Sequence, residues 1–478
     1  MIEPLSLRKL CLTGCWLVSA FCMHASPAED RQWYRLSIDG DRVGYGWRDR
    51  VLQSGQYIDS EVTRVDVEEL RKPLIVEMRT EVTRTATGIA KEIHVESVIG
   101  TERNGWDGRF DVDGHTLNVL VAATSGTQTY LAPPELILPD TLPAALKPLW
   151  LDRHPSIEFA YLEPTAAKPM PLRAELIASP PMSEAQVVQI RITETSAHSI
   201  RKETLGFDMQ GNLRHLERPF FGATLIWDLC LRDCDAPVDR PFDLMAKLVV
   251  QSPYRIPRSA FPGPIRYVLS RIDGTPALLP STGEQSVVSD DARAIVTICS
   301  SCGVAETLTE SERKLYLQSN AWVQSDSADI RQFARGHGAG GTPEEIMSHL
   351  VDAVRFHMTG PVDYLGYPSA VEALRTRSGD CTEYAVLLAA LARAKNIPAR
   401  LAYGLVYADR FSGKKDVFSP HAWVQAWTGT RWESYDAGIG EFDATHLVLS
   451  IGSGDPRDVE NPAGAPAKLR IEKLGLVK

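Results

Sequence analysis

Cys381 is the residue of this sequence best suited to nucleophilic chemistry. It lies in RSGDCTEYAVLLAALARAKNIPAR, residues 377–400, directly before a long apolar run. Asp380 and Glu383 are spaced as the N-cap and third residue of a capping box, which predicts that a helix begins at Cys381. A first helical turn favours a thiolate, but the two carboxylates oppose one, so Cys381 needs a positive neighbour. The alternative interpretation of Cys381 is a small buried hydrophobic residue.

A histidine and an aspartate follow on two strand-like segments. His421 begins HAWVQAW, Asp436 lies in RWESYDAG, and Gly429-Thr430 between them suits a two-residue hairpin turn. In an antiparallel pair, opposed residues have a constant index sum, and this turn makes the sum odd. His421 and Asp436 then share a face as diagonal neighbours, whereas a three-residue turn would separate them unless a bulge intervenes. A cysteine, a histidine and a carboxylate together would perform acyl transfer through a thioester.

These blocks, together with NIPARLAYGLVY, resemble the transglutaminase-like, papain-related core over roughly residues 317–449. The resemblance implies an α+β fold, in which the helix carrying the cysteine packs on an antiparallel sheet. It also implies that Cys381 is the nucleophile, that His421 is the general base and then acid, and that Asp436 is the orienting carboxylate.

Three aromatic residues are implied as support for this site. Trp423 and Trp432 match aromatic positions of the family. Tyr364, in VDYLGYPSA, is a candidate second donor to the oxyanion, beside the backbone N–H of Cys381. We expect no cofactor and no metal site, since an EF-hand calcium loop is absent from the sequence.

The function expected from the resemblance is that of a cysteine hydrolase or acyltransferase acting on amide bonds of peptides or proteins. A protein-glutamine transglutaminase with an amine acceptor is the second hypothesis. A non-catalytic binding or scaffold protein on the same fold is the third. The formal net charge of −10 argues against nucleic acid as a partner.

The N-terminus predicts export to the periplasm or secretion. Arg8 and Lys9 precede the apolar stretch 10–21, which is typical of a signal peptide over residues 1–25. An uncleaved anchor is the rival interpretation, and LTGC, ending at Cys15, resembles a lipoprotein cleavage box. No later apolar run is long enough for a membrane span, so we expect none in the mature chain.

Five cysteines remain after such a cleavage. Two close pairs, Cys230 with Cys234 and Cys299 with Cys302, predict local disulfides, which leaves Cys381 as a free thiol. A four-cysteine zinc site and a redox role for CSSC are the alternatives.

The length of 478 residues predicts two or three domains. Short strand-like runs with turn signals predict an antiparallel β-rich N-terminal region, which the proline-rich stretch 133–181 should divide into two halves. The expected organisation is a β-rich domain over 30–257, a β connection over 258–305, the catalytic core over 306–455 and a tail over 456–478 with a possible strand.

Overall fold

The computed structural model describes residues 31–477 except 70–71, 101, 112–115, 122–126, 134, 165–166, 179–187, 196–199, 221–222, 239–241, 291, 300–302, 304, 361–368 and 456–465. The predicted signal peptide, Tyr364 and Cys302 therefore lie outside the described residues. Within the described part of the chain, no helix is both long and apolar enough to cross a membrane.

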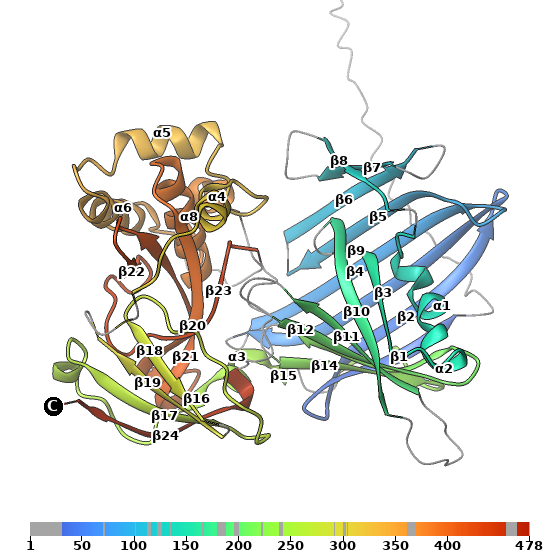
Figure 1. Ribbon diagram of the computed structural model, residues 1–478, viewed down its shortest axis with the longest axis horizontal. Helices are drawn as coiled ribbons and strands as arrows, with labels where there is room; N and C mark the ends of the chain where they lie inside the picture. The colour runs from blue at the N-terminus through green and yellow to red at the C-terminus, as the bar shows by residue number, and fades with distance from the viewer. Residues whose placement is uncertain are drawn as a thin grey trace, which may run out of the picture.

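The N-terminal half forms one large sheet, which curves through the right of Figure 1. Its order is β8-β7-β6-β5-β4-β3-β2-β1-β14-β13-β12-β11-β10-β9, with β15 beside β3. The strands are β1 (Gln32–Ile38), β2 (Asp41–Gln53), β3 (Gln56–Glu69), β4 (Lys72–Thr85), β5 (Ala90–Ile99), β6 (Glu102–Phe110), β7 (Thr116–Val121), β8 (Thr127–Leu131), β9 (Ser156–Glu163), β10 (Lys168–Ala178), β11 (Val188–Thr195), β12 (Ile200–Phe207), β13 (Leu213–Phe220), β14 (Ala223–Cys230) and β15 (Phe242–Asp243).

The proline-rich stretch separates the strands β1–β8 from β9–β14, and the two sets form the two halves of a single sheet. β1 pairs with β2 on one side and with β14 on the other, so the strands before and after the proline-rich stretch belong to the same sheet. The alternation of β1 places Tyr34, Leu36 and Ile38 on the buried face. Two short helices from the proline-rich stretch, α1 (Leu142–Leu146) and α2 (Pro148–Leu151), contribute Leu146 and Leu149 to the same apolar cluster.

The C-terminal half contains a second sheet, of order β16-β21-β20-β23 with β22 on β21, covered by helices. The strands are β16 (Val250–Gln251), β20 (Ala399–Phe411), β21 (Lys414–Trp427), β22 (Trp432–Tyr435) and β23 (Leu447–Gly452). The helices are α3 (Leu244–Leu248), α4 (Glu310–Leu317), α5 (Ala328–Gly336), α6 (Pro343–His357), α7 (Ala370–Thr376) and α8 (Cys381–Ala394).

Helix α8 is the centre of this half. Every residue from Val386 to Ala392 is fully buried, because α8 packs on β20 and β21 while α5, α6 and α7 pack against it. Burying each of its leucines contributes roughly 1.5–3 kcal/mol. The α+β fold class, with the cysteine-bearing helix on an antiparallel sheet, is confirmed.

A third sheet joins segments from distant parts of the sequence. Its order is β18-β19-β17-β24, with β17 (Ile265–Arg271), β18 (Gln285–Ser289), β19 (Arg293–Ile298) and β24 (Leu469–Leu476). Figure 1 shows β24, near the end of the chain, beside β17 at the lower left. Tyr267 of β17 packs on Phe418 of β21, and its hydroxyl group donates to Ala444 O at 2.7 Å. This third sheet therefore packs on the core sheet.

Candidate active site

The start of α8 places Cys381 in the first helical turn. Asp380 is the N-cap, and its Oδ1 accepts a hydrogen bond from the Thr382 N–H at 2.7 Å. Glu383 completes the capping box, since its Oε2 accepts from the Asp380 N–H at 2.6 Å. Gly379 has a φ of +148°, and a Cβ there would lie 2.5 Å from the Glu383 side chain. A glycine is thus required where the chain enters the helix.

The β21–β22 hairpin has the register that a turn at Gly429-Thr430 predicts. Trp427 lies opposite Trp432, and Val424 lies opposite Tyr435, so the index sum is odd. Gly429 has a φ of +102°, which suits a glycine in the first turn position. His421 and Asp436 share a face as a result, and His421 Nε2 lies 2.6 Å from Asp436 Oδ2.

Cys381, His421 and Asp436 surround the position that a Cβ on Gly438 would occupy. A Cβ on Gly438 would lie 3.2 Å from Asp436 Oδ1, 3.6 Å from His421 Cε1 and 3.7 Å from Cys381 Cα. The backbone N–H of Ala422, next to His421, hydrogen-bonds the Cys381 sulfur. Because Asp436 holds Nε2 of His421, Nδ1 is the ring nitrogen left for Cys381.

The protein environment keeps Cys381 protonated at rest. Burial raises the pKa of the Cys381 thiol well above its usual value, and the negative charges of Asp380 and Glu383 raise it further, while the Ala422 N–H opposes them. The two carboxylates therefore oppose a thiolate, as the sequence predicts. A base must take the thiol proton when the sulfur reacts.

Asp436 is ionised, although it is almost completely buried. Burial would raise the pKa of its carboxyl group, but hydrogen bonds from His421 and His446 outweigh burial and hold this pKa well below its usual value. The second oxygen, Oδ1, accepts from the backbone N–H groups of Gly438 at 2.7 Å and Ile439 at 3.2 Å. Four donors thus fix the carboxylate in one orientation.

His446 is a member of this cluster that sequence reasoning missed. Its Nε2 lies 3.1 Å from Asp436 Oδ2, and its side chain is fully buried. It directly precedes β23, which pairs with β20 on the side away from β21. The strand-like HLVLSIG was a usable signal for a buried strand. The order of the strands in the sheet, which brings His446 to Asp436, has no local sequence signature.

The same three side chains are the one group of potential metal ligands in the described part of the chain. The ligand atoms of His421, Asp436 and His446 lie within 4.8 Å of one another. The Nε2–Oδ2 distance of 2.6 Å, however, is that of a hydrogen bond. Two ligands of one zinc ion, each about 2 Å from it, lie more than about 3 Å apart in tetrahedral geometry. As they lie, the residues do not fit a metal.

Of the two expected supporting tryptophans, only Trp423 touches the site. Its ring lies 6.1 Å from the ring of His421 and 5.1 Å from that of His446. Trp432 instead lies under Arg400, whose guanidinium carbon is 3.9 Å from the indole centroid. It can therefore affect Asp436 only through the hairpin strand that the two share.

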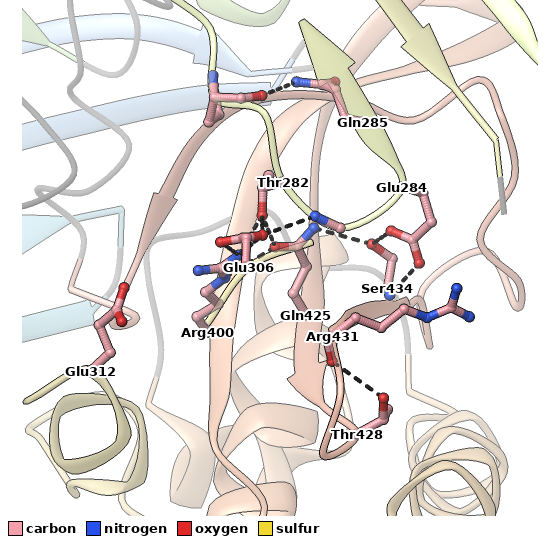
Figure 2. A network of polar contacts seen from close by, with 12 residues as sticks. Thr282, Glu284, Gln285, Glu306, Glu312, Arg400, Gln425, Thr428, Arg431 and Ser434 are labelled. Carbon is pink, nitrogen blue, oxygen red and sulfur yellow. Dashed lines mark hydrogen bonds and ion pairs between the residues drawn. The ribbon is translucent and has the colours of Figure 1, made fainter. Parts of the chain in front are cut away.

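A polar network around Arg400 holds this hairpin against the segment 282–306 (Figure 2). Arg400 is 1% exposed, and it donates to both oxygens of Glu306 at 3.1 Å and to Gln425 Oε1 at 3.1 Å. It also donates to Thr282. The network positions β22 from outside the core sheet, and sequence reasoning missed it.

A second arm of the network reaches the strand that carries Asp436. Glu284 accepts hydrogen bonds from the Ser434 backbone N–H at 2.8 Å and from its hydroxyl group at 2.7 Å. The Ser434 Oγ in turn lies 3.3 Å from Trp423 Nε1. The indole beside His421 and the strand that carries Asp436 are therefore tied to the same glutamate.

The described cysteines divide into bonded and free. Cys230 and Cys234 form a disulfide, and Cys299 is also disulfide-bonded. Cys381 is the one free cysteine among the described residues, and it is partly exposed. The pairing of Cys302 lies outside the described residues.

We expect Asp380→Asn to make Cys381 reactive at lower pH. Asparagine caps a helix as well as aspartate does, but it removes the charge that raises the pKa of Cys381. Of the two carboxylates that raise the pKa of Cys381, Asp380 is the larger cause and Glu383 the smaller one. The measurement is the rate of alkylation by iodoacetamide as a function of pH.

Two variants control this result. Asp380→Ala also loses the cap and should cost about 1 kcal/mol of stability. Glu345→Gln, at the third position of the α6 capping box, removes a carboxylate from another helix start and should leave the alkylation profile unchanged. An Asp380→Asn profile that superimposes on the wild type would show that Asp380 does not control the thiol.

Comparisons with known proteins agree with this site. Residues 331–437 match the Transglutaminase-like superfamily. Over 90 residues the chain is 33% identical to an uncharacterized protein of Mycobacterium leprae (strain TN), a match that spans 18% of this chain and 32% of that protein. The chain thus covers about a third of the length of this relative.

Two solved structures are also similar to parts of the chain. A beta-barrel-like protein of a domain of unknown function from Brucella abortus is 12% identical over 42% of this chain and 94% of that one, with a TM-score of 0.32. The periplasmic domain of TgpA from Pseudomonas aeruginosa is 19% identical over 52% of this chain and 85% of that one, with a TM-score of 0.27. The region that holds Cys381, His421 and Asp436, residues 331–437, thus matches the transglutaminase-like superfamily.

Proposed function

We propose that this protein is an exported cysteine enzyme that cleaves or transfers acyl groups at amide bonds of peptides or proteins. The observation that carries the proposal is the convergence of Cys381, His421 and Asp436 on Gly438, with Asp436 hydrogen-bonded to His421. The disulfide between Cys230 and Cys234 supports export, since disulfides persist in oxidising compartments.

The first half of the reaction forms a thioester. His421 Nδ1 takes the thiol proton as the Cys381 sulfur attacks the carbonyl carbon of the amide, and the carbonyl oxygen becomes an oxyanion. His421, now an imidazolium stabilised by Asp436, then gives that proton to the departing nitrogen as the C–N bond breaks. The acyl group remains on sulfur, and an amine leaves.

The second half regenerates the thiol. Water or an amine attacks the thioester, and His421 takes a proton from the attacking atom. The C–S bond then breaks, and the proton returns to the sulfur. Hydrolysis results with water and acyl transfer with an amine. The raised pKa of the Cys381 thiol fits this scheme, because the thiol keeps its proton until His421 removes it during the attack.

We expect Cys381 to be the only residue that can be alkylated in the folded, unreduced, mature protein. Intact-mass analysis after treatment with iodoacetamide should show one added label, which is lost in Cys381→Ala. The physical reason is that the other cysteines predicted to remain after export pair locally. Two or more labels would contradict the pairing.

The experiment that tests the function uses the same variant. Full-length protein is incubated with a peptide mixture from its host envelope, quenched in acid and examined by mass spectrometry for an acyl group on Cys381. An adduct that is labile to hydroxylamine and absent from Cys381→Ala supports the proposal. If no adduct forms although Cys381 alkylates normally, the scaffold hypothesis gains instead.

A further inference from the structure

We propose that His446 is a positioning residue of this site, which shares one oxygen of Asp436 with His421 and supplies the charge that balances this carboxylate. The inference rests on the proposed function, since it assigns His421 as the base. His446 directly precedes β23 and lies outside the residues that match the transglutaminase-like superfamily, 331–437.

The geometry puts two imidazoles on one carboxylate oxygen. Asp436 Oδ2 lies 2.6 Å from His421 Nε2 and 3.1 Å from His446 Nε2. An ionised oxygen only accepts hydrogen bonds, so each Nε2 must carry a proton. The proton on Nε2 of a neutral His421 leaves the lone pair on Nδ1, the nitrogen that is left for Cys381.

The other nitrogen of His446 also faces acceptors. Its Nδ1 lies 3.1 Å from the carbonyl oxygen of Asp443 and 3.3 Å from Asp443 Oδ1. The backbone N–H of Asp443 competes for the same nitrogen at 3.2 Å. With a carboxylate at each end of the ring, His446 is placed to hold two protons. Burial lowers the pKa of His446, but Asp436 and Asp443 outweigh burial and raise it to about 9.

Apolar rings enclose this unit. His446 is fully buried, with Phe442 at 4.9 Å and Trp423 at 5.1 Å between ring centroids. Two ionisable groups that face it, Asp436 and Asp443, come from the connection between β22 and β23. A third, His421, comes from β21, and its ring lies 5.7 Å away. From β17, Tyr267 donates to Ala444 O, and its pKa is raised well above its usual value by burial and then by Asp443.

The charge balance has a consequence for His421. The positive charge of His446 neutralises Asp436, so a second proton on His421 would add a net positive charge to a buried cluster. With an uncharged residue at 446, Asp436 would be free to stabilise that second proton. A charge on His446 therefore competes with a charge on His421 for the same oxygen of Asp436.

The test uses the full-length mature protein with ¹⁵N-labelled histidine and follows the imidazole nitrogens with pH. In the wild type, we expect His446 to carry two protons at pH 7 and His421 to carry one, on Nε2. His446→Gln keeps a donor to Asp436 but removes the charge, and His446→Phe removes both. In His446→Gln, His421 should take up its second proton at higher pH than in the wild type. In His446→Phe, His421 should also take up its second proton at higher pH than in the wild type, while Asp436 keeps the first proton on Nε2.

A matched control is present on the N-terminal sheet. His215 lies between Asp228 at 2.7 Å and Glu217 at 3.2 Å, and its pKa is also raised to about 9, chiefly by Glu217. His215→Gln should leave the His421 signals unchanged. A single proton on His446 at pH 7, or His421 titrations that superimpose in the wild type and His446→Gln, would overturn the proposal.

The outcome is separable from that of the proposed function. If the nitrogen spectra behave as expected but no acyl group forms on Cys381, His446 positions His421 and the acyl chemistry is wrong. If acyl-Cys381 forms and the His421 signals are the same in the wild type and the His446 variants, the proposed function is supported and the role of His446 is wrong.

Discussion

Asp436→Asn is expected to lower the rate of acylation of Cys381 by about 10⁴-fold while the protein stays folded, the size of loss seen when an orienting aspartate is replaced in other triads. The physical reason lies in the two oxygens of the carboxylate. Oδ1 accepts from two backbone N–H groups, so the oxygen of an asparagine would stay there. Its NH₂ group would then point at His421 and His446.

An NH₂ group in that position forces the wrong proton arrangement. His421 Nε2 would have to accept a hydrogen bond, which moves the ring proton to Nδ1. That nitrogen could no longer take the thiol proton of Cys381. The buried positive charge of His446 would also lose its carboxylate, so His446 should become neutral near pH 7.

The measurement is single-turnover acylation by p-nitrophenyl acetate and by any peptide found in the trapping experiment. The ester has a good leaving group, so the variant should lose less of its acylation rate with the ester than with the peptide. Asp228→Asn is the matched control, because it alters an equivalent histidine–aspartate pair, with His215, away from the site. Acylation of Asp436→Asn within tenfold of the wild type would show that Asp436 does not orient the base.

Arg400→Ala is expected to destabilise the C-terminal half by about 3 kcal/mol, the lower end of the range for a broken buried pair, because Arg400 is buried while Glu306 is partly exposed. The carboxylate of Glu306 would keep its negative charge without its cation. The space between Trp432 and Tyr316, whose rings lie 3.9 Å and 5.8 Å from the guanidinium carbon, would also open. The loss should appear in urea unfolding followed by tryptophan fluorescence.

Two further arginine variants are the controls for this result. Arg400→Met fills the space without the charge, so it should cost less than alanine. Arg431→Ala removes a neighbouring arginine of Figure 2 whose pair with Glu433 is half exposed, and it should cost less than about 1 kcal/mol. A wild-type unfolding midpoint for Arg400→Ala would mean that water compensates Glu306 and that the network does not hold the hairpin.

Local sequence was sufficient for the elements that carry the predicted triad. The capping box at Asp380 and Glu383, with a glycine before it, predicted the first residue of α8 because these signals act within one helical turn. Gly429-Thr430 predicted the register of the β21–β22 hairpin, because a tight turn determines which residues lie opposite each other.

The tertiary structure decided the partners that come from a distance in the sequence. His446 reaches Asp436 because β23 pairs with β20 on the side away from β21, and Arg400 meets Glu306 and Thr282 because the segment between β17 and α4 folds back on the core. The pairing of β1 with β14 made one sheet of two expected halves. Such contacts depend on the order of strands in a sheet and on which buried charges must be paired. Both are properties of the assembled fold, so no local pattern of residues specifies them.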